Sequence, residues 1–405
     1  MKVSISKGKA KGFVQAPPSK SMAHRLLICA GLAEGRSVIH GIAESEDVLA
    51  TIDCLRALGV EIIREKDKIT VTGTDIRIAA PRQVLRCRES GSTLRFFVPV
   101  CLISGTNAVL TGAESLMKRP MGIYKTICDE RGLIFSQDAT SVMLKGPLKS
   151  GCYRLAGNVS SQFISGLLFA LPLLEGDSKL TITPPIESRS YIDMTISALA
   201  QFGVEAVWKD ENTITIRGSQ RYQAREAWVE GDYSNAAFFE ALNVLGGDVE
   251  IGGLDPESIQ GDKVYARMFE QLKKGTPTLN ISDCPDLGPV LFSVAAAGSG
   301  GVFCDTKRLK IKESDRGQVM AEVLGKFGVS VTVYEDEIVI YPARFEAPSK
   351  PLYGYNDHRI VMSEAVLLSL TGGIIEGAEA VTKSFPDFFD KLRTLGIEVK
   401  EIEDN

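Results

Sequence analysis

Six apolar runs, each opened by a short polar cluster, are the most regular feature of the chain. The runs carry almost no charge and are long enough for at least two helical turns, so they predict six helices buried on all sides. The polar clusters supply the small polar residues that cap helix starts. The six runs are residues 26–33, 96–103, 163–174, 236–245, 287–297 and 360–370.

The clusters recur at nearly constant spacing. Arg25 and Arg95 are 70 residues apart, Gln162 follows 67 residues later, and Pro289 and Arg359 are again 70 apart. One interval, from Asn235 to Pro289, is shorter at 54 residues. A period of this length across a whole chain indicates repeated structural units.

Each period contains the same succession of elements. A short strand such as residues 37–41 follows the apolar helix, and an amphipathic helix then ends at a glycine such as Gly59. An alternating hairpin, residues 60–63 with 69–73, comes next. The pattern predicts an α/β protein of six repeats, three in each of two globules.

The two ends of the chain complement each other. Residues 3–14 begin with a strand and contain no helix, while the sixth repeat ends with a single strand at 397–402. We therefore expect the N-terminal strand to complete the sixth sheet. One domain is then residues 1–14 with 232–405 and the other is residues 15–231, joined by a two-strand hinge near 15–18 and 228–232.

Composition narrows the class of protein. The 405 residues carry a formal net charge of −5, which argues against nucleic-acid binding. Eight cysteines without a CxxC pair and only three histidines argue against structural zinc and predict reduced thiols in a cytoplasmic protein. The longest uncharged stretch, residues 155–174, has a polar start and Pro172, so no membrane span is expected. No targeting segment is apparent and a monomer is expected.

The polar clusters suggest the chemistry. Helix starts in equivalent repeats share one face, so positive helix ends should converge on one cleft. Basic side chains there predict a small substrate with several anionic groups, and Asp286, Glu313 and Asp357 among them supply proton-transfer groups. Taken alone, residues 310–316 are typical of a solvated charge run at a helix start. The basic residues are Lys20, Arg25, Arg95, Arg119, Lys312, Arg316, Arg359 and Lys383.

Nine motifs in order resemble those of the 5-enolpyruvylshikimate-3-phosphate synthases (3-phosphoshikimate 1-carboxyvinyltransferases). The resemblance covers essentially the whole chain. The motifs occupy residues 18–25, 90–95, 118–122, 160–163, 190–193, 229–234, 310–316, 356–359 and 383–386. The resemblance implies a two-domain inside-out α/β barrel, the enolpyruvyl transferase fold, with six βαβαββ repeats, three per domain, helices inside and sheets outside. It also implies that the enolpyruvyl group of phosphoenolpyruvate moves to the 5-hydroxyl of shikimate 3-phosphate through a tetrahedral intermediate, without metal or cofactor.

The resemblance implies roles for individual residues. Asp286 is the implied base on the hydroxyl, Glu313 the proton donor and acceptor at the methylene carbon, and Lys20 and Lys312 assist charge transfer. Shikimate 3-phosphate would be held by Lys20, Ser21, Arg25, Ser160, Ser161, Gln162, Ser188, Tyr191, Asp286 and Lys312. Phosphoenolpyruvate would be held by Lys20, Gly91, Arg119, Gln162, Arg316, Arg359 and Lys383.

Two departures from the family's usual pattern alter local contacts. Glu89-Ser90 stands where many members have Asn-Ala, and Arg308 stands where an amide is common. Gly91 is retained, and in this family that glycine borders the site shared by phosphoenolpyruvate and glyphosate, so glyphosate inhibition is expected. His24 is expected to be structural.

Two alternatives remain at this point. The sister enzyme that transfers enolpyruvate to UDP-N-acetylglucosamine should carry a loop cysteine near Arg119, but residues 112–122 contain none. A phosphosugar-binding protein on the same scaffold would need no acid–base set such as Asp286 with Glu313.

Overall fold

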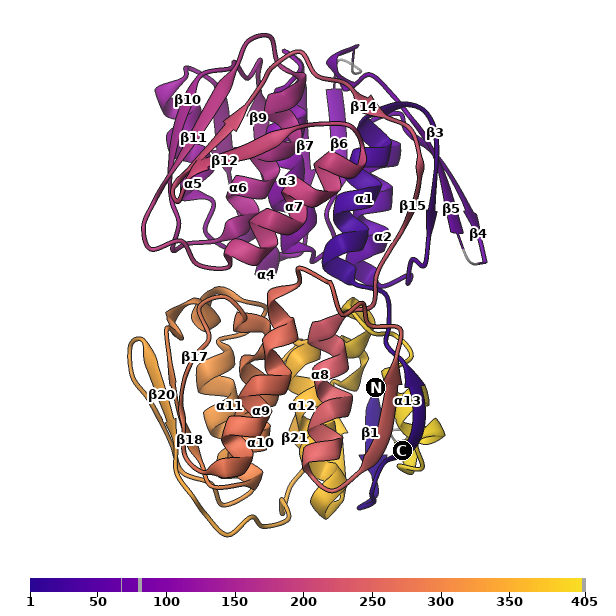
Figure 1. The fold of residues 1–405 in the computed structure, drawn as a ribbon, viewed down its shortest axis with the longest axis vertical. Helices are drawn as coiled ribbons and strands as arrows, with labels where there is room; N and C mark the ends of the chain where they lie inside the picture. The colour runs from indigo at the N-terminus through magenta and orange to yellow at the C-terminus, as the bar shows by residue number, and fades with distance from the viewer. Residues whose placement is uncertain (67, 79–81, 403–405) are drawn as a thin grey trace. The chain divides into compact units, whose positions relative to one another are not determined.

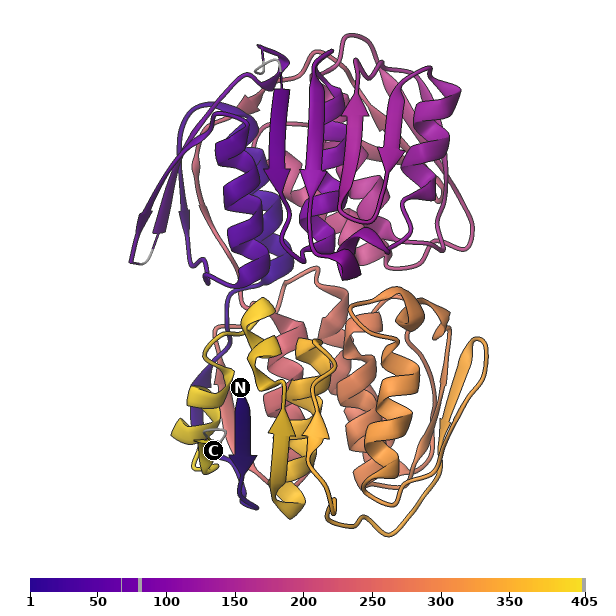
Figure 2. The ribbon, with the colours of Figure 1, turned by 180° about the vertical axis from the view of Figure 1, so that it is seen from behind.

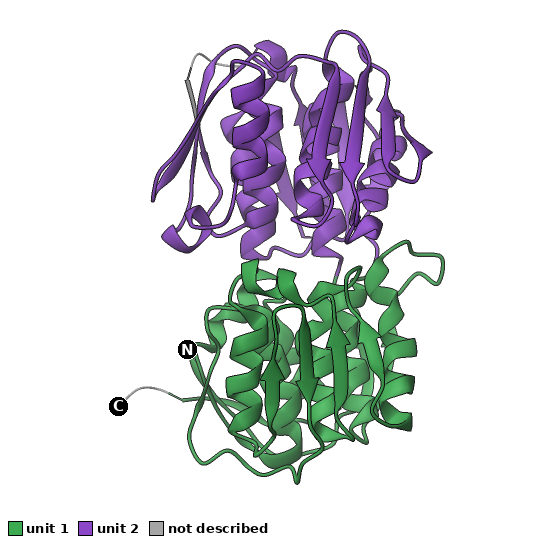
Figure 3. Cartoon of the chain, turned by 90° about the vertical axis from the view of Figure 1, so that its left-hand side faces the viewer, with its two compact units in different colours: residues 1–17, 231–405 green, residues 18–230 purple. Residues whose placement is uncertain are grey.

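The computed structural model describes residues 1–66, 68–78 and 82–402. Two compact units emerge: unit 1 is Met1–Pro17 with Gly231–Asn405, and unit 2 is Pro18–Glu230 (Figure 3). Each unit has its own apolar core. Residues 15–17 belong with unit 1 because the backbone amide of Ala16 donates to Gly252 and that of Asp232 to Pro17.

Three sheets and their helices make up unit 2. In Figure 2 the purple sheet β6-β7-β9-β8 stands on the near side of this unit with helices behind it. The elements are α1(Lys20–Leu32), β3(Ala33–His40), α2(Glu46–Ala57), β4(Glu61–Glu65), β5(Lys68–Gly73), η1(Ile76–Ile78), β6(Arg82–Arg86), α3(Gly91–Leu102), β7(Asn107–Thr111), α4(Glu114–Met117), α5(Gly122–Glu130), β8(Ile134–Gln137), β9(Ser141–Lys145), β10(Cys152–Ala156), α6(Ser161–Ala170), η2(Leu171–Leu173), β11(Ser178–Thr183), α7(Arg189–Gln201), β12(Ala206–Asp210), β13(Thr213–Ile216), β14(Tyr222–Gln223) and β15(Glu226–Trp228).

Unit 1 contains two four-stranded sheets and one two-stranded sheet, together with their helices (Figure 1). Its elements are β1(Lys2–Ile5), β2(Lys11–Gln15), α8(Tyr233–Val244), β16(Asp248–Gly252), η3(Gly261–Val264), α9(Tyr265–Lys274), β17(Thr278–Asn280), η4(Pro285–Leu287), α10(Gly288–Ala297), β18(Gly301–Cys304), η5(Lys307–Ile311), α11(Arg316–Gly325), β19(Val331–Val333), β20(Glu337–Ile340), β21(Leu352–Tyr353), α12(His358–Thr371), β22(Gly373–Glu376), η6(Ala378–Lys383), α13(Phe388–Thr394) and β23(Val399–Ile402).

Three of the sheets have the same strand order. In β6-β7-β9-β8, β10-β11-β13-β12 and β17-β18-β20-β19 the first pair is parallel and the others antiparallel. The helix joining each parallel pair, α3, α6 or α10, is buried over nearly its whole length. The predicted α/β class and the buried apolar helices are therefore confirmed.

The helices end where the glycines predicted. Gly59 after α2 has φ +90° and Gly396 after α13 has φ +85°. Only glycine adopts this left-handed conformation without a steric cost, which explains the abrupt stops. Within the described residues, no helix has the length and apolar character needed to cross a membrane.

The first strand completes the last sheet, as expected. β1 lies between β22 and β23 and pairs antiparallel with both, with Val3 opposite Ile375 on one side and Glu401 on the other. This is the position that the inner hairpin strand occupies in the other sheets. This sheet is therefore assembled from strands that lie far apart in the sequence.

The pairing of the two strands exchanged between the units was not predicted. β2 precedes α1 in the sequence but lies in unit 1, where it pairs in parallel with β16 after α8. β15 precedes α8 but lies in unit 2, where it pairs in parallel with β3 after α1. Each unit thus takes the strand before its first buried helix from a distant part of the chain.

A buried acid on α12 makes unit 1 sensitive to pH. Glu364 has no solvent exposure, and among the described residues neither of its carboxyl oxygens has a hydrogen-bond partner. Burial raises the pKa of Glu364 well above its usual value, although Lys326 and the Tyr353 backbone oppose the shift. The native state therefore holds this proton more tightly than the unfolded state.

Glu364→Gln is expected to stabilise unit 1 at neutral and alkaline pH. Between the unfolded and the raised native pKa, the native state binds more protons than the unfolded state, so the wild-type free energy of unfolding falls as pH rises. Glutamine cannot ionise and removes this slope. We expect the Tm difference to grow by a few degrees from pH 4 to 8 in a calorimetric series. A constant difference across pH would show that Glu364 ionises freely.

Candidate functional site

Arg316 is the centre of a charged cluster in unit 1. It begins α11, its side chain is 1% exposed, and its guanidinium contacts three carboxylates. Nε and Nη2 donate to the two oxygens of Asp357 at 2.9 and 3.2 Å, Nη2 donates to Glu313 Oε2 at 2.7 Å, and Nη1 donates to Asp286 Oδ1 at 2.9 Å. Burial opposes the charge, but these carboxylates raise the pKa of Arg316.

Lys312 shares Asp286 with Arg316. Its Nζ donates to Asp286 Oδ1 at 3.0 Å. Burial lowers the pKa of Lys312, with Arg308 and Arg316 adding to the effect while Asp286 and Glu313 oppose it. An ammonium group in this setting gives up a proton more readily than an exposed lysine. Asp286, Glu313 and Lys312 are thus gathered around one buried guanidinium.

Arg359 and Lys383 lie at neighbouring helix ends. Arg359 is buried in the first turn of α12, and its Nη2 donates to Ser234 Oγ at 2.6 Å while Nη1 donates to Asn235 Oδ1 at 3.3 Å at the start of α8. Its Nη2 is 3.8 Å from Asp286 Oδ2. Lys383 Nζ donates to the carbonyl of Asn356 at 2.7 Å. The unit 1 residues predicted for the site are therefore connected through Asp286 and the loop before α12.

Asp357 has a different role from the proton-transfer group predicted for it. Its side chain has no solvent exposure and accepts hydrogen bonds from Arg316, from Ser314 Oγ at 2.9 Å and from the backbone amide of Arg359 at 2.9 Å. It therefore caps α12 and fixes Arg316. The interpretation of residues 310–316 as a solvated charge run is also wrong, because Arg316 is buried.

In unit 2, Lys20 and Arg25 lie on the first turns of α1. Lys20 Nζ bonds Asp47 Oδ2 at 2.9 Å, which links the start of α1 to the first turn of α2. Arg25 is 3% exposed; its Nε donates to Thr195 Oγ1 at 2.9 Å and its Nη2 to the Tyr191 carbonyl at 2.8 Å. Burial lowers the pKa of Arg25 to about 10, and the guanidinium remains charged at neutral pH.

A second group in unit 2 surrounds the start of α3. Arg95 Nη1 donates to Gln162 Oε1 at 2.6 Å, and Gln162 Nε2 donates to Ser92 Oγ at 2.9 Å, so the orientation of this amide is determined. Gly91 opens the helix, and a Cβ there would lie 2.6 Å from Arg119 Nη1. The guanidinium of Arg119 therefore lies directly against the bare backbone of Gly91.

The remaining predicted residues of unit 2 also occupy helix starts. Ser160 caps α6 by accepting the amide of Gln162, and Ser161 opens the same helix. Ser188 precedes α7 in a left-handed conformation, φ +54°. The pairing of Lys20 with Asp47 and of Arg359 with Ser234 and Asn235 was not predicted. The only signal for Asp47 was its place in the acidic first turn of the helix after the first repeat strand.

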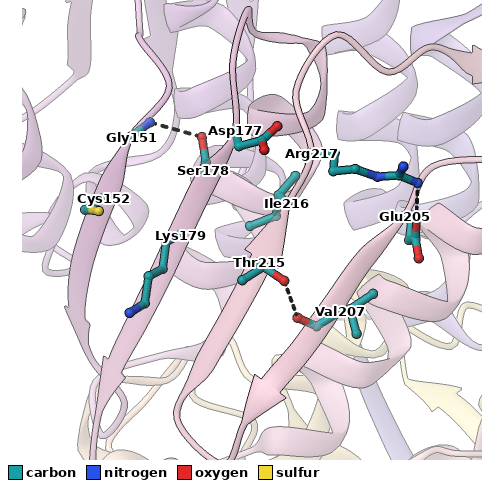
Figure 4. Close-up of a pocket in the computed structure, with 10 residues that line it drawn as sticks. All are labelled: Gly151, Cys152, Asp177, Ser178, Lys179, Glu205, Val207, Thr215, Ile216 and Arg217. Carbon is teal, nitrogen blue, oxygen red and sulfur yellow. Dashed lines mark hydrogen bonds and ion pairs between the residues drawn. The ribbon is translucent and has the colours of Figure 1, made fainter.

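The surface depression drawn in Figure 4 lies elsewhere. It has a volume of about 550 Å³ and lies over the solvent side of β10, β11, β13 and β12, with Cys152, Lys179 and Arg217 among its lining residues. None of the residues predicted for the site borders it. Among the described residues there is no group of three or more histidine, cysteine, aspartate or glutamate side chains suited to a metal ion.

Comparison with known proteins gives consistent matches. The family model for EPSP synthase (3-phosphoshikimate 1-carboxyvinyltransferase) matches residues 5–392. A 3-phosphoshikimate 1-carboxyvinyltransferase of Clostridium perfringens is 39% identical, and one of Clostridium kluyveri is 37% identical; each match covers 98% of both proteins.

Solved structures agree with these matches. The EPSP synthase from Acinetobacter baumannii superposes with a TM-score of 0.78 at 25% identity, covering both chains completely. The enolpyruvyl transferase NikO from Streptomyces tendae superposes with a TM-score of 0.79 at 14% identity, over 98% of each chain, and shares the fold.

Proposed function

The chain belongs to the EPSP synthase family, and on that premise we propose how its residues transfer the enolpyruvyl group of phosphoenolpyruvate to the 5-hydroxyl of shikimate 3-phosphate. This transferase reaction releases phosphate and belongs to the shikimate pathway. The observation that carries the proposal is the cluster in which Arg316 bonds both Asp286 and Glu313, because it joins anion-binding and proton-transfer groups in one place.

The basic groups supply the binding of the substrates. We assign the carboxylate and phosphate of phosphoenolpyruvate to Lys20, Gly91, Arg119, Gln162, Arg316, Arg359 and Lys383. We assign shikimate 3-phosphate to Lys20, Ser21, Arg25, Ser160, Ser161, Gln162, Ser188, Tyr191, Asp286 and Lys312. Guanidinium forks and exposed helix amides suit both kinds of anion, which supports this division.

The carboxylates supply the proton transfers. Asp286 accepts hydrogen bonds from Lys312 and Arg316. It takes the proton of the 5-hydroxyl while the hydroxyl oxygen forms a bond to the central carbon of phosphoenolpyruvate. Glu313 gives a proton to the methylene carbon, which completes the tetrahedral intermediate. Cleavage of the carbon–oxygen bond to phosphate then releases phosphate as the new methyl group returns a proton to Glu313. Lys20 and Lys312 balance the negative charge that develops.

A phosphate-release assay tests the function. We expect release with phosphoenolpyruvate and shikimate 3-phosphate together, and none when UDP-N-acetylglucosamine replaces shikimate 3-phosphate. Release with UDP-N-acetylglucosamine would assign the sister reaction. If calorimetry shows binding of shikimate 3-phosphate but no phosphate is released, the chain is a binding protein and not an enzyme.

The proposed binding residues come from both units, so we propose that the two chain crossings act as a hinge. In the empty protein, the basic groups and helix starts that we assign to the substrates repel one another, and an anionic ligand removes that repulsion. Shikimate 3-phosphate is expected to reduce the radius of gyration in solution scattering and to tighten phosphoenolpyruvate binding. An identical scattering curve with and without the ligand would contradict the hinge.

Gly91→Ala is expected to weaken glyphosate much more than phosphoenolpyruvate. We propose that glyphosate competes with phosphoenolpyruvate beside this glycine. The flexible end of Arg119, whose Nη1 lies 2.6 Å from the Cβ position, can shift to admit the methyl group, which then crowds the longer inhibitor more than the substrate. A misplaced methyl group costs about 10–200-fold in a fitted pocket. The ratio of the glyphosate inhibition constant to the phosphoenolpyruvate KM measures the effect.

Gly122→Ala is the matched control for this substitution, because a Cβ at Gly122 would meet no other atom within 4 Å. It should change neither constant. Equal losses for both ligands in Gly91→Ala would show that the glycine serves only the turn.

Two further features complete the proposal. All eight cysteines are free thiols, which supports a cytoplasmic location, where thiols stay reduced. The family uses small-molecule substrates, and we propose that the chain acts on them as a monomer without a cofactor.

A further inference from the structure

A buried chain of hydrogen bonds joins three helices of unit 2. His24 Nδ1 on α1 is 2.7 Å from Thr51 Oγ1 on α2, and Thr51 Oγ1 is 2.8 Å from Thr93 Oγ1 on α3. Thr93 Oγ1 then donates to Ser90 Oγ at 2.8 Å. All four side chains have no solvent exposure, so water cannot replace any of these bonds.

One arrangement of the hydrogens uses every contact of this hydrogen-bond chain. Thr93 has one hydroxyl hydrogen, which goes to Ser90 Oγ at 2.8 Å or, less favourably, to the Asp47 carbonyl at 3.5 Å. The contact between the two threonines allows either donor, but when Thr93 gives its hydrogen to Ser90, Thr51 must donate its own hydrogen to Thr93. The only donor left for the contact with Thr51 is then Nδ1–H of His24. In this arrangement Nδ1 of His24 carries a proton.

The surroundings of His24 agree with this assignment. Among the described residues Nε2 of His24 is buried without a hydrogen-bond partner, as a bare acceptor nitrogen can be, and the ring packs edge-on against Phe96 at 6.5 Å between centroids. Burial lowers the pKa of His24 well below its usual value, and the neighbouring charges of Lys20 and Arg25 add to the effect. A second proton would face both cations.

The chain of hydrogen bonds ends at Ser90, beside residues that we assign to phosphoenolpyruvate. Ser90 Oγ also accepts the backbone amide of Thr93, which caps α3, and Gly91 is the next residue. Asp47 adjoins Thr93 through its carbonyl and holds Lys20 through its carboxylate at 2.9 Å. The chain thus fixes the starts of α1, α2 and α3 relative to one another at one end of unit 2.

We propose that His24, as the Nδ1–H tautomer, is a positioning residue for phosphoenolpyruvate, and that it acts through Thr51 and Thr93 on the Ser90–Gly91 turn. The inference rests on the proposed function for the identity of the ligand. It assigns no contact between His24 and substrate. The tautomer itself is a property of the free protein and is tested without any ligand.

Nitrogen-15 NMR of the imidazole rings tests the tautomer. The chain has three histidines, so spectra of His40→Gln and His358→Asn variants assign the signals of His24. We expect a protonated Nδ1 and a bare Nε2 that do not change between about pH 5.5 and 8.5. A protonated Nε2, or titration of His24 within this range, would overturn the proposal.

Kinetics of Thr51 variants test the positioning role. Thr51→Val keeps the shape of the side chain but removes the link, and we expect the phosphoenolpyruvate KM to rise about five- to tenfold while the dissociation constant of shikimate 3-phosphate changes less than twofold. Thr51→Ser restores the hydroxyl and should recover the wild-type KM. Thr70→Val is the matched control, because the buried hydroxyl of Thr70 has no hydrogen-bond partner among the described residues.

Failure of the proposed function and failure of the positioning role of His24 give different results. A wild-type enzyme without phosphate release would refute the proposed function and leave the NMR result to judge the tautomer. An active wild type whose phosphoenolpyruvate KM is unchanged in Thr51→Val would refute the positioning role. Equal losses for both substrates, or equal effects of Thr51→Val and Thr70→Val, would also refute it, because they indicate general destabilisation of the core.

Discussion

Replacing Glu313 with glutamine is expected to lower kcat by about 10²–10⁴-fold, the usual contribution of a general acid or base. Glu313 Oε2 accepts a hydrogen bond from Arg316 Nη2 at 2.7 Å, and its side chain is 17% exposed. The amide oxygen of glutamine can accept the same bond, so the cluster should keep its geometry. What is lost is the proton that the methylene carbon needs.

Steady-state kinetics and equilibrium binding distinguish this effect from a binding defect. The dissociation constant of shikimate 3-phosphate should stay close to that of the wild type, because the loss belongs to the transition state. Glu335→Gln makes the same chemical change at an exposed site of unit 1 and should be silent. Turnover of Glu313→Gln within a few-fold of the wild type would show that another group carries the proton.

Arg316→Met is expected to destabilise unit 1 by about 3–5 kcal/mol, as breaking a buried ion pair does. The arginine is 1% exposed and Asp357 has no exposure, so the substitution leaves a buried carboxylate without its cation. Asp286 and Glu313 lose a donor as well. Urea unfolding followed by circular dichroism measures the loss, and the KM for phosphoenolpyruvate should rise in the same variant.

A double substitution tests the cause of this destabilisation. Asparagine at position 357 removes the buried charge and still caps α12, because asparagine is a good residue at a helix start. Arg316→Met with Asp357→Asn should therefore unfold at a higher urea concentration than Arg316→Met alone. No recovery in the double variant would mean that lost packing around the arginine, rather than the unpaired carboxylate, dominates.

Local patterns in the sequence predicted most of the elements. The apolar runs matched α1, α3, α6, α8, α10 and α12, because a helix buried on all sides needs an uncharged run and a capped start. The glycines after α2 and α13 marked the helix ends. The residue that ends each helix has a left-handed backbone, and this depends only on the neighbouring residues in the sequence. The sequence also predicted which polar clusters open the buried helices.

Long-range pairings could not be read in this way. Arg316 looks solvated within residues 310–316, and its burial depends on Asp286 and Asp357, which lie 30 and 41 positions away. The partner of Lys20, Asp47, is on another helix. The exchange of β2 and β15 depends on parallel pairing with distant strands, because β2 pairs with β16 after α8 and β15 pairs with β3 after α1. Nothing in one repeat specifies such a partner.

The strand exchange has a consequence for synthesis on the ribosome. Unit 2 is one continuous segment, Pro18–Glu230, and is synthesised in full before any of α8 is made. β1 and β2 are synthesised before unit 2, but β2 has no partner until β16 is translated, and β1 none until β22. Unit 2 can therefore fold before β1 and β2 have partner strands. The sheet that contains β1 is complete only when β23 has left the exit tunnel.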